Sequence, residues 1–474
     1  MSSHRIATMS ASMAVIGLNV AFGVAPPAVA EPCTGAVANA MPPQPIATPA
    51  PQERPLPWPF NQLPLGHKPL NANDNAPLPS LGKLPLAILG ALSPNAAKVD
   101  KQAAVVPPRP PNVTEPQPAA PAPVAVPAPG VGASPGTSIV GWVTGLDGAA
   151  NTLQKFGISG TDLGIMWDNG DPANHQVLMA FGDTYGYCGV RGQQWRYNTL
   201  LRTQDRVLAR GINVANGSIS DRYAGSPERQ SGFAKQVIPS IRWAPAEKGV
   251  IPTAGISVGR TQYMNFMSIK NWDNPGQWTT NFSAIAVSTD NGQNWGVYPG
   301  TIRTAAPDAL AQVPYAAGNE NFQQGSFLRS GDGYVYSFGT PSGRHGAAYL
   351  ARVPQGFVPD LTKYEYWNGS WVPNNPAAAT PVIPGPVGEM SAQYNTYLKQ
   401  FLMMYGKDSG DIVVRTAPAP EGPWSPEQMI VSAAETPGGV YAPYLHPWST
   451  GKELYFNLSL WSAYNVMLMK TVLP

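Results

Sequence analysis

The segment Val177–Gly182, with the sequence VLMAFG, is an apolar run that ends in an aromatic and a small residue. Similar runs recur at Tyr263–Ser268, Tyr334–Gly339, Phe401–Gly406 and Leu454–Asn457. Each run follows a turn and a short strand, and each is followed by another predicted strand, at residues 199–202, 284–287, 347–351, 412–415 and 466–469. Five such units predict an all-β fold, a five-bladed β-propeller, because one blade buries both of its faces only against its neighbours. A sandwich with long loops is the alternative architecture.

Three regions of different composition divide the chain. Residues 1–30 have the features of a secretory signal peptide: Arg5, an apolar stretch from 9 to 24, and Ala28-Val29-Ala30 before the expected cleavage point. A short membrane anchor is the alternative. Residues 31–136 are rich in Pro and Ala, which predicts an extended or disordered linker, either a spacer through a cell envelope or a tail without a specific partner. Residues 137–474 form the predicted propeller domain, and we expect a secreted or envelope-held protein.

Charge and motifs limit the possible ligands. Charged residues make up only 12% of the chain and the formal net charge is +2, which gives neither a basic surface for nucleic acid nor an acidic tail. No motif for a nucleotide, a dinucleotide or a catalytic zinc ion is present, so we expect neither a cofactor nor a metal. The turn Asp168–Asp171 hints at calcium but lacks the other ligands of a known loop. Cys33 and Cys188 either form one disulfide or remain two free thiols.

Asp162 and Asp183 bracket one predicted hairpin, which consists of a strand at 163–167, a turn at 168–175 and a second strand at 176–181. An antiparallel pair puts the start of the first strand beside the end of the second, so the two carboxylates should meet at one edge of the sheet. First strands line the channel of a propeller, which places Asp162 at the mouth of the axis. A pair of carboxylates at one rim is the catalytic equipment of a glycoside hydrolase. The alternative is that both are ordinary turn residues.

Other residues are candidates for contacts with a sugar. Trp272, Trp278 and Asn281 offer aromatic faces and an amide, although a packed Trp-rich loop is the alternative. Glu320 and Glu389 precede the first strands of the third and fourth blades and are either at the same mouth or ordinary loop residues. His345 follows a strand and is either a partner of a substrate hydroxyl or a solvated loop residue. No arginine cluster for an acidic sugar is evident, because Arg242, Arg260 and Arg344 are scattered in the sequence.

The segment Ser288–Trp295 matches the Asp-box pattern S-x-D-x-G-x-x-W in full. In such a turn the aspartate accepts backbone hydrogen bonds, the glycine takes a positive φ and the tryptophan packs the hairpin. The pattern favours a propeller hairpin and a structural role for Asp290, which we therefore exclude from the site.

Several of these stretches, in this order, resemble the DUF4185 domain family of actinobacteria: Thr161–Gly164, Phe181–Thr184, Ile251–Ile256, Trp278–Asn281 and the Asp-box. The resemblance covers residues 140–474. It implies a five-bladed propeller with endo-D-arabinanase activity on the arabinan of mycobacterial-type cell walls, and Asp162 and Asp183 match the two acidic positions of the family. The longer turn at 168–175 and the Pro-rich arm depart from the family pattern.

The resemblance and the candidate residues together favour a secreted glycoside hydrolase that uses Asp162 and Asp183. Asp183 is favoured as the acid, with its pKa raised by repulsion between the two carboxylates. Retention or inversion stays open. The expected partner is a cell-wall polysaccharide, with no nucleic acid and no stable membrane insertion after signal cleavage, and the expected state is a monomer. The alternative is a non-catalytic glycan-binding propeller tethered in the envelope.

Overall fold

The structure is a computed structural model that describes residue 33 and residues 37–38, 40–42, 136–146, 148–190, 194–274, 276–436 and 438–474. The predicted signal peptide and most of the predicted linker lie outside these residues. Within the described part of the chain, no helix is long and apolar enough to span a bilayer.

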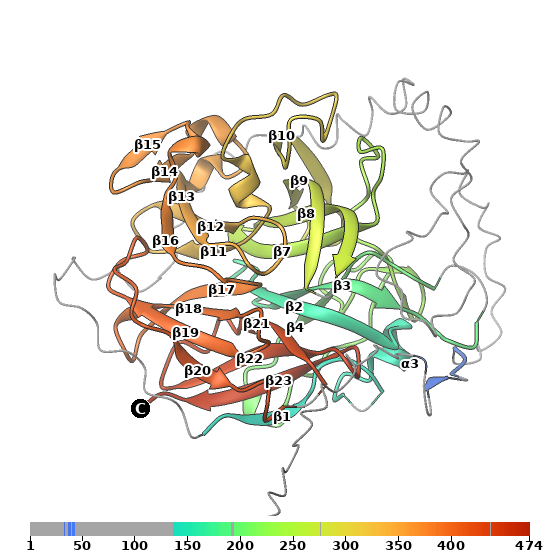
Figure 1. The fold of residues 1–474 in the computed structure, drawn as a ribbon. Helices are drawn as coiled ribbons and strands as arrows, with labels where there is room; N and C mark the ends of the chain where they lie inside the picture. Colours follow the sequence, from blue (N-terminus) through green and yellow to red (C-terminus); the bar gives the residue numbers. More distant parts are fainter. Residues whose placement is uncertain are drawn as a thin grey trace, which may run out of the picture.

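Five antiparallel sheets surround a common axis and confirm the predicted five-bladed propeller (Figure 1). Blade 1 contains β2 (Gly160–Asp168), β3 (Val177–Tyr185) and β4 (Thr199–Thr203). Blade 2 contains β7 (Gly249–Val258), β8 (Thr261–Asn274), β9 (Gln277–Ser288) and β10 (Gly296–Thr304). Blade 3 contains β11 (Gln324–Arg329), β12 (Tyr334–Thr340), β13 (Ala348–Pro354), β14 (Glu365–Trp367), β15 (Trp371–Pro373) and β16 (Pro381–Ile383).

The last two blades complete the ring. Blade 4 contains β17 (Met390–Asn395), β18 (Gln400–Gly406), β19 (Ile412–Ala417) and β20 (Gln428–Val431). Blade 5 contains β21 (Val440–Leu445), β22 (Glu453–Leu460), β23 (Asn465–Val472) and β1 (Ser138–Trp142). Because β1 begins the domain and pairs with β23 at the end of the chain, backbone hydrogen bonds close the ring. Shorter elements lie in the connections: α3 (Thr152–Phe156), β5 (Glu228–Gln230), β6 (Phe233–Ala234), η3 (Leu208–Arg210), η4 (Asn319–Phe322), η5 (Gln355–Phe357), η6 (Leu361–Lys363) and η7 (Pro376–Ala378).

The recurring apolar runs are the second strands of the blades, as predicted: β3, β8, β12, β18 and β22. Every residue of β3 is buried, because a second strand has a neighbour on each side within its own sheet and another blade against each face. The first strands β2, β7, β11, β17 and β21 each lie next to two other first strands, which forms a closed wall around the axis. We call the end of the axis at which these five strands begin the axis mouth.

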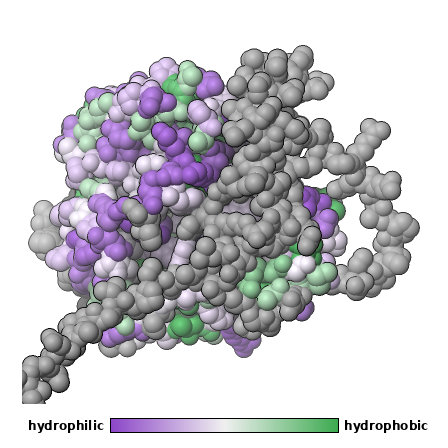
Figure 2. All heavy atoms as spheres, turned by 45° about the vertical axis from the view of Figure 1, so that its right-hand side comes forward, coloured by the Kyte–Doolittle hydropathy of each residue, from purple (hydrophilic) through white to green (hydrophobic). Residues whose placement is uncertain are grey.

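The outer surface has no single dominant apolar area on the face that Figure 2 shows, where hydrophilic and hydrophobic residues are interspersed over the described part. Large exposed apolar side chains such as Ile139, Val207 and Phe357 come from separate elements. Single exposed apolar residues of this kind are common on protein surfaces and need no special role.

The Asp-box connects β9 to β10 at the end of blade 2 that lies away from the axis mouth. Asp290 accepts hydrogen bonds from Asn294 N at 2.9 Å and from Ser288 Oγ at 2.8 Å. Gly292 has a φ of 76°. The hairpin is also hydrogen-bonded to blade 1, because Nε of Arg202 in β4 donates to Asn291 O at 2.8 Å. The carboxylate of Asp290 is thus used within its own turn.

Cys33 and Cys188 form a disulfide, with their Cα atoms 5.6 Å apart. Near it, Val37 and Ala40 pack against an apolar cluster that includes Tyr187. The bond resolves the alternative that the sequence left open and fixes Cys33 to the loop that follows β3. Cys33, through this disulfide, and β1, through its pairing with β23, are therefore both fixed to the propeller.

Candidate active site

The hairpin of β2 and β3 brings the two predicted acids together. Thr161 pairs with Thr184 and Leu163 pairs with Phe181, with an irregularity between the two pairs. Asp162 therefore lies opposite Gly182 and Asp183 on the neighbouring strand. The irregularity comes from β2, where Leu163 has a φ of 72° and the next residue, Gly164, has a φ of 77°. A leucine in the left-handed region is strained, and such strain is found at functional sites.

The carboxyl group of Asp162 is held closely on one side. Tyr441 donates a hydrogen bond from its hydroxyl to Oδ2 at 3.0 Å. Oδ1 is buried and accepts no hydrogen bond from the described residues. It faces Gly182, where an added Cβ would stand only 2.4 Å from Oδ1. The lack of a side chain at this position therefore makes room for the acid.

Burial raises the pKa of Asp162 from 3.8 to about 7. The hydrogen bond from Tyr441 and the positive charge of Arg344 lower this pKa, whereas the negative charge of Glu389 raises it. The sequence predicted a raised pKa through repulsion between Asp162 and Asp183. The main cause is instead the loss of water around the carboxyl group, and the repelling charge that contributes is that of Glu389.

Asp183 lies in the same group of tyrosines and is only 2% exposed. Burial raises the pKa values of Tyr185 and Tyr464, and the charges of both Asp162 and Asp183 raise them further. The two tyrosine rings are 5.3 Å apart, edge to face. The two carboxyl groups therefore lie near the same tyrosines at the axis mouth.

An ion pair completes this group. Arg344 donates to Glu389 through Nε at 2.8 Å and through Nη2 at 2.5 Å. Its guanidinium carbon lies 5.3 Å from the ring of Trp278 and 5.2 Å from the ring of Tyr441. The arginine comes from the β12–β13 loop of blade 3, so it links that loop to residues of blades 2, 4 and 5. From the sequence, Arg344 was considered only as one of three scattered arginines, and its part in this group was not predicted.

Trp278 and Glu389 belong to this group, but Trp278 is not free to stack on a sugar. It is 6% exposed and carries the guanidinium of Arg344 over its ring. Trp272, which is partly exposed, packs against it with ring centroids 6.0 Å apart.

Three further candidates have other partners. Asn281 is buried and donates its amide to Ala246 O and Ser268 Oγ. Glu320 accepts hydrogen bonds from Tyr315 and Gly318. His345 is exposed and contacts Gln277 and Asp408. Among the described contacts of these three residues, none reaches Asp162.

Sequence reasoning missed Arg344, Tyr441, Tyr464 and one more acid, Glu247. Burial raises the pKa of Glu247, and Ser268 donates to its Oε2 at 2.7 Å. The pKa of Tyr197 is raised mainly by burial. The negative charges of Glu247 and Asp183 raise it further. Glu247 lies two residues before β7 of blade 2, and Glu389 lies one residue before β17 of blade 4. A position just before a first strand is the feature that pointed to Glu389.

Among the described residues, no group of three or more His, Cys, Asp or Glu side chains is placed to hold a metal ion. The carboxylates of the Asp168–Asp171 turn already have protein partners, both inside the turn and outside it. Asp168 accepts a hydrogen bond from Gly170 N at 2.8 Å, and Asp171 accepts one from the hydroxyl of Tyr223 at 2.9 Å.

Fold and site define a five-bladed β-propeller with a buried, protonatable aspartate among tyrosines at one end of its axis. The chain belongs to a family described as "Domain of unknown function (DUF4185)", whose model matches residues 147–470. The resemblance seen in the sequence is thereby confirmed.

The chain is also similar to two fungal proteins. It is 30% identical to "Notoamide biosynthesis cluster protein J'" of Aspergillus versicolor over 332 residues, which cover 65% of this chain and 83% of that protein. It is 29% identical to "Notoamide biosynthesis cluster protein J" of Aspergillus sp. (strain MF297-2) over 326 residues, which cover 65% and 82%.

Solved structures with partial similarity include two arabinofuranosidases. The α-L-arabinofuranosidase PaAbf62A of Podospora anserina has 10% identity and a TM-score of 0.37, over 70% of this chain and 97% of that one. The catalytic domain of the GH62 α-L-arabinofuranosidase of Coprinopsis cinerea has 10% identity and a TM-score of 0.38, over 67% and 91%. These values are too low to transfer a function to this chain.

Proposed function

We propose that this protein is a secreted glycoside hydrolase that cleaves a furanosidic cell-wall polysaccharide. The resemblance to actinobacterial members of the family favours endo-action on the D-arabinan of arabinogalactan or lipoarabinomannan. The observation that carries the proposal is the carboxyl group of Asp162, which has a pKa of about 7 and lies beside Asp183 at the axis mouth. A carboxylic acid that keeps its proton near neutral pH is what protonation of a glycosidic oxygen requires.

In the proposed reaction the two aspartates have different roles. Asp162 donates its proton to the leaving glycosidic oxygen as the bond to the anomeric carbon breaks. Asp183, as a carboxylate, either removes a proton from the attacking water or attacks the anomeric carbon itself, and water then releases the sugar. The raised pKa of Asp162 favours this assignment over the weak sequence-based preference for Asp183 as the acid. Tyr441 orients the acid, and the Arg344–Glu389 pair sets the charge around it.

Two further features support an extracellular setting. The first thirty residues have the composition of a signal peptide. The Cys33–Cys188 disulfide suits an oxidising compartment.

Incubation with purified arabinogalactan tests the proposed function. The wild-type protein should release arabino-oligosaccharides, which are separated by chromatography, and Asp162→Asn should release them at least about 100-fold more slowly. Asp308→Asn, which changes an exposed aspartate, is the matched control and should release as much as the wild type. Retention of the wild-type protein on immobilised arabinogalactan without any release would favour the alternative, a non-catalytic glycan-binding propeller.

The Asp-box should affect stability and not chemistry. Asp290→Ala removes the acceptor for Asn294 N and Ser288 Oγ, so we expect a loss of about 1–3 kcal/mol in the free energy of unfolding. The hairpin lies away from the axis mouth, so oligosaccharide release per folded molecule should be unchanged. Melting curves check the predicted loss of stability, and rates of oligosaccharide release on the same preparation check that the chemistry is unchanged. A variant with wild-type melting and no activity would place Asp290 in the site.

The pH at which the rate of hydrolysis falls should shift in opposite directions in the variants Glu389→Gln and Tyr441→Phe. The rate should fall as the pH rises through about 7, because Asp162 loses its catalytic proton. Glu389→Gln removes a negative charge that raises the pKa of Asp162, so this fall should move to lower pH. Tyr441→Phe removes a hydrogen bond that favours the ionised form, so the fall should move to higher pH.

Profiles of kcat/KM against pH for the wild type, Glu389→Gln and Tyr441→Phe check this prediction. The pH at which kcat/KM falls can be compared even if the variants differ in their absolute rates. Shifts in the same direction, or no shift in either variant, would contradict the assignment of Asp162 as the acid.

A further inference from the structure

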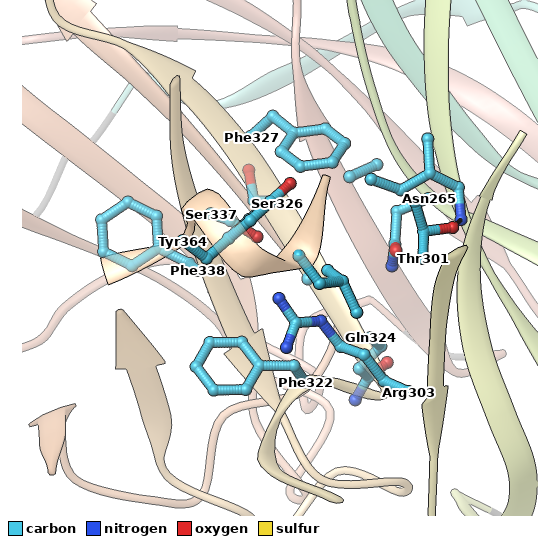
Figure 3. A pocket seen from close by; sticks show the side chains of 14 residues that line it. Asn265, Thr301, Arg303, Phe322, Gln324, Ser326, Phe327, Ser337, Phe338 and Tyr364 are labelled. Carbon is cyan, nitrogen blue, oxygen red and sulfur yellow. Dashed lines mark hydrogen bonds between the residues drawn. The ribbon is translucent and has the colours of Figure 1, made fainter. Parts of the chain in front are cut away.

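A pocket between blades 2 and 3 contains none of the residues that form the candidate active site. It is lined from blade 2 by residues such as Asn265 and Thr301, and from blade 3 by Gln324, Ser337 and Phe338. Figure 3 shows the side chain of Arg303, from β10, directed into the middle of this pocket. The proposed reaction uses neither the pocket nor this arginine.

Arg303 is a buried cation whose partners are all neutral. It is 6% exposed, and its Nη1 donates to Asn319 Oδ1 at 3.0 Å and to the hydroxyl of Tyr366 at 2.7 Å. The rings of Phe322 and Tyr364 lie 5.1 Å from its guanidinium carbon. Among the described residues, no carboxylate forms an ion pair with it. A buried charge is expensive unless it is paired, so this arrangement needs a partner.

The unused donors of Arg303 point to where that partner binds. A guanidinium carries five N–H groups, and here only those of Nη1 have protein acceptors within the described part of the chain. The buried Arg202 is different, because its Nε, Nη1 and Nη2 all donate to protein oxygens. Nε and Nη2 of Arg303 are therefore available to an acceptor in the pocket.

We propose that this pocket binds one small inorganic anion, a halide such as chloride, on Nε and Nη2 of Arg303. A single negative charge compensates the guanidinium, which a water molecule cannot do. The rings of Phe322, Tyr364 and Tyr366, all within 5.5 Å of the guanidinium carbon, crowd its surroundings, which favours a small ion over a sugar or a nucleotide. The hydroxyl of Ser337, on the opposite wall, is a further donor.

The bound anion would stabilise the contact between the two blades and, through it, a loop of the candidate active site. Gln324, in the pocket wall, donates from Nε2 to Gly343 O at 2.6 Å. Gly343 directly precedes Arg344. The pocket thus borders the loop that carries the ion pair at the axis mouth.

Melting temperatures in different salts test the proposal with the full chain. At equal ionic strength, the wild-type protein should melt several degrees higher in sodium chloride or bromide than in sodium gluconate, because a ligand of the folded state stabilises it. Arg303→Met keeps the side-chain stem and should lose this difference between salts. Arg352→Met, which removes an arginine of the neighbouring blade 3 that is paired with Glu365, should keep it.

A bromide-soaked crystal of the wild-type protein decides the matter even if Arg303→Met does not fold. We expect an anomalous bromide peak within hydrogen-bonding distance of Nε and Nη2 of Arg303. Absence of that peak, or equal melting of the wild-type protein in all three salts, would overturn the proposal.

Discussion

Asp162→Asn should lower the rate of glycan hydrolysis by about 10²–10⁴-fold, because the variant has no proton to donate to the leaving oxygen. Asp183→Asn should have an effect of the same order, because an amide neither activates water nor attacks the anomeric carbon. Both changes preserve size and shape, so the propeller should stay folded. A folded variant with a rate close to that of the wild type would show that its aspartate is not catalytic.

The stability of Asp162→Asn separates a catalytic loss from unfolding. The pKa of Asp162 is about 7 in the folded protein, above the value of 3.8 for an unperturbed aspartate. The folded state therefore binds its proton more tightly than the unfolded state, and this contribution to stability is lost as the pH rises from about 4 to about 7. Asparagine does not ionise, so the variant should melt at least as high as the wild type, with its largest advantage above pH 7. Melting curves at acidic and alkaline pH measure this advantage.

Gly182→Ala should lower the rate of hydrolysis strongly although it removes no functional group. The added Cβ would stand 2.4 Å from Oδ1 of Asp162 and 3.0 Å from Leu163 Cδ1, so the carboxyl group has to move. A displacement of about 1 Å at a reacting group can cost about 100-fold in rate. We therefore expect about a 100-fold loss of hydrolysis.

Gly141→Ala is the matched control for this change, because an added Cβ at Gly141 of β1 meets nothing within 4 Å. Its rate and melting temperature should equal those of the wild type. Wild-type hydrolysis by Gly182→Ala would mean that the position of the Asp162 carboxyl group is not critical.

The blades and the pairing of Asp162 with Asp183 could be predicted from the sequence, because both depend on local order. The turn at 168–175 joins β2 directly to β3 and so brings Asp162 near Asp183, and the recurring apolar runs mark the second strand of each blade. The Asp-box was likewise predictable, because its hydrogen bonds lie within one turn.

Contacts across the axis could not be predicted in this way. Tyr441 meets Asp162 across 279 positions of the sequence, and Arg344 meets Glu389 from the loop of a different blade. Trp278 was predicted to stack on a sugar, but the guanidinium of Arg344 lies over its ring. Burial, the main cause of the raised pKa of Asp162, could not be predicted either, because it depends on how all five blades close around the axis.

A carbon-13 NMR titration of the aspartate carboxyl groups tests the central claim most directly, because it needs no substrate. The resonance of Asp162 is identified by its absence from the spectrum of Asp162→Asn. We predict that it titrates with a midpoint near pH 7, so that the acid is largely protonated at mildly acidic pH and about half protonated at neutrality. A midpoint near 3.8, the value of an unperturbed aspartate, would contradict the account of Asp162 as a buried general acid.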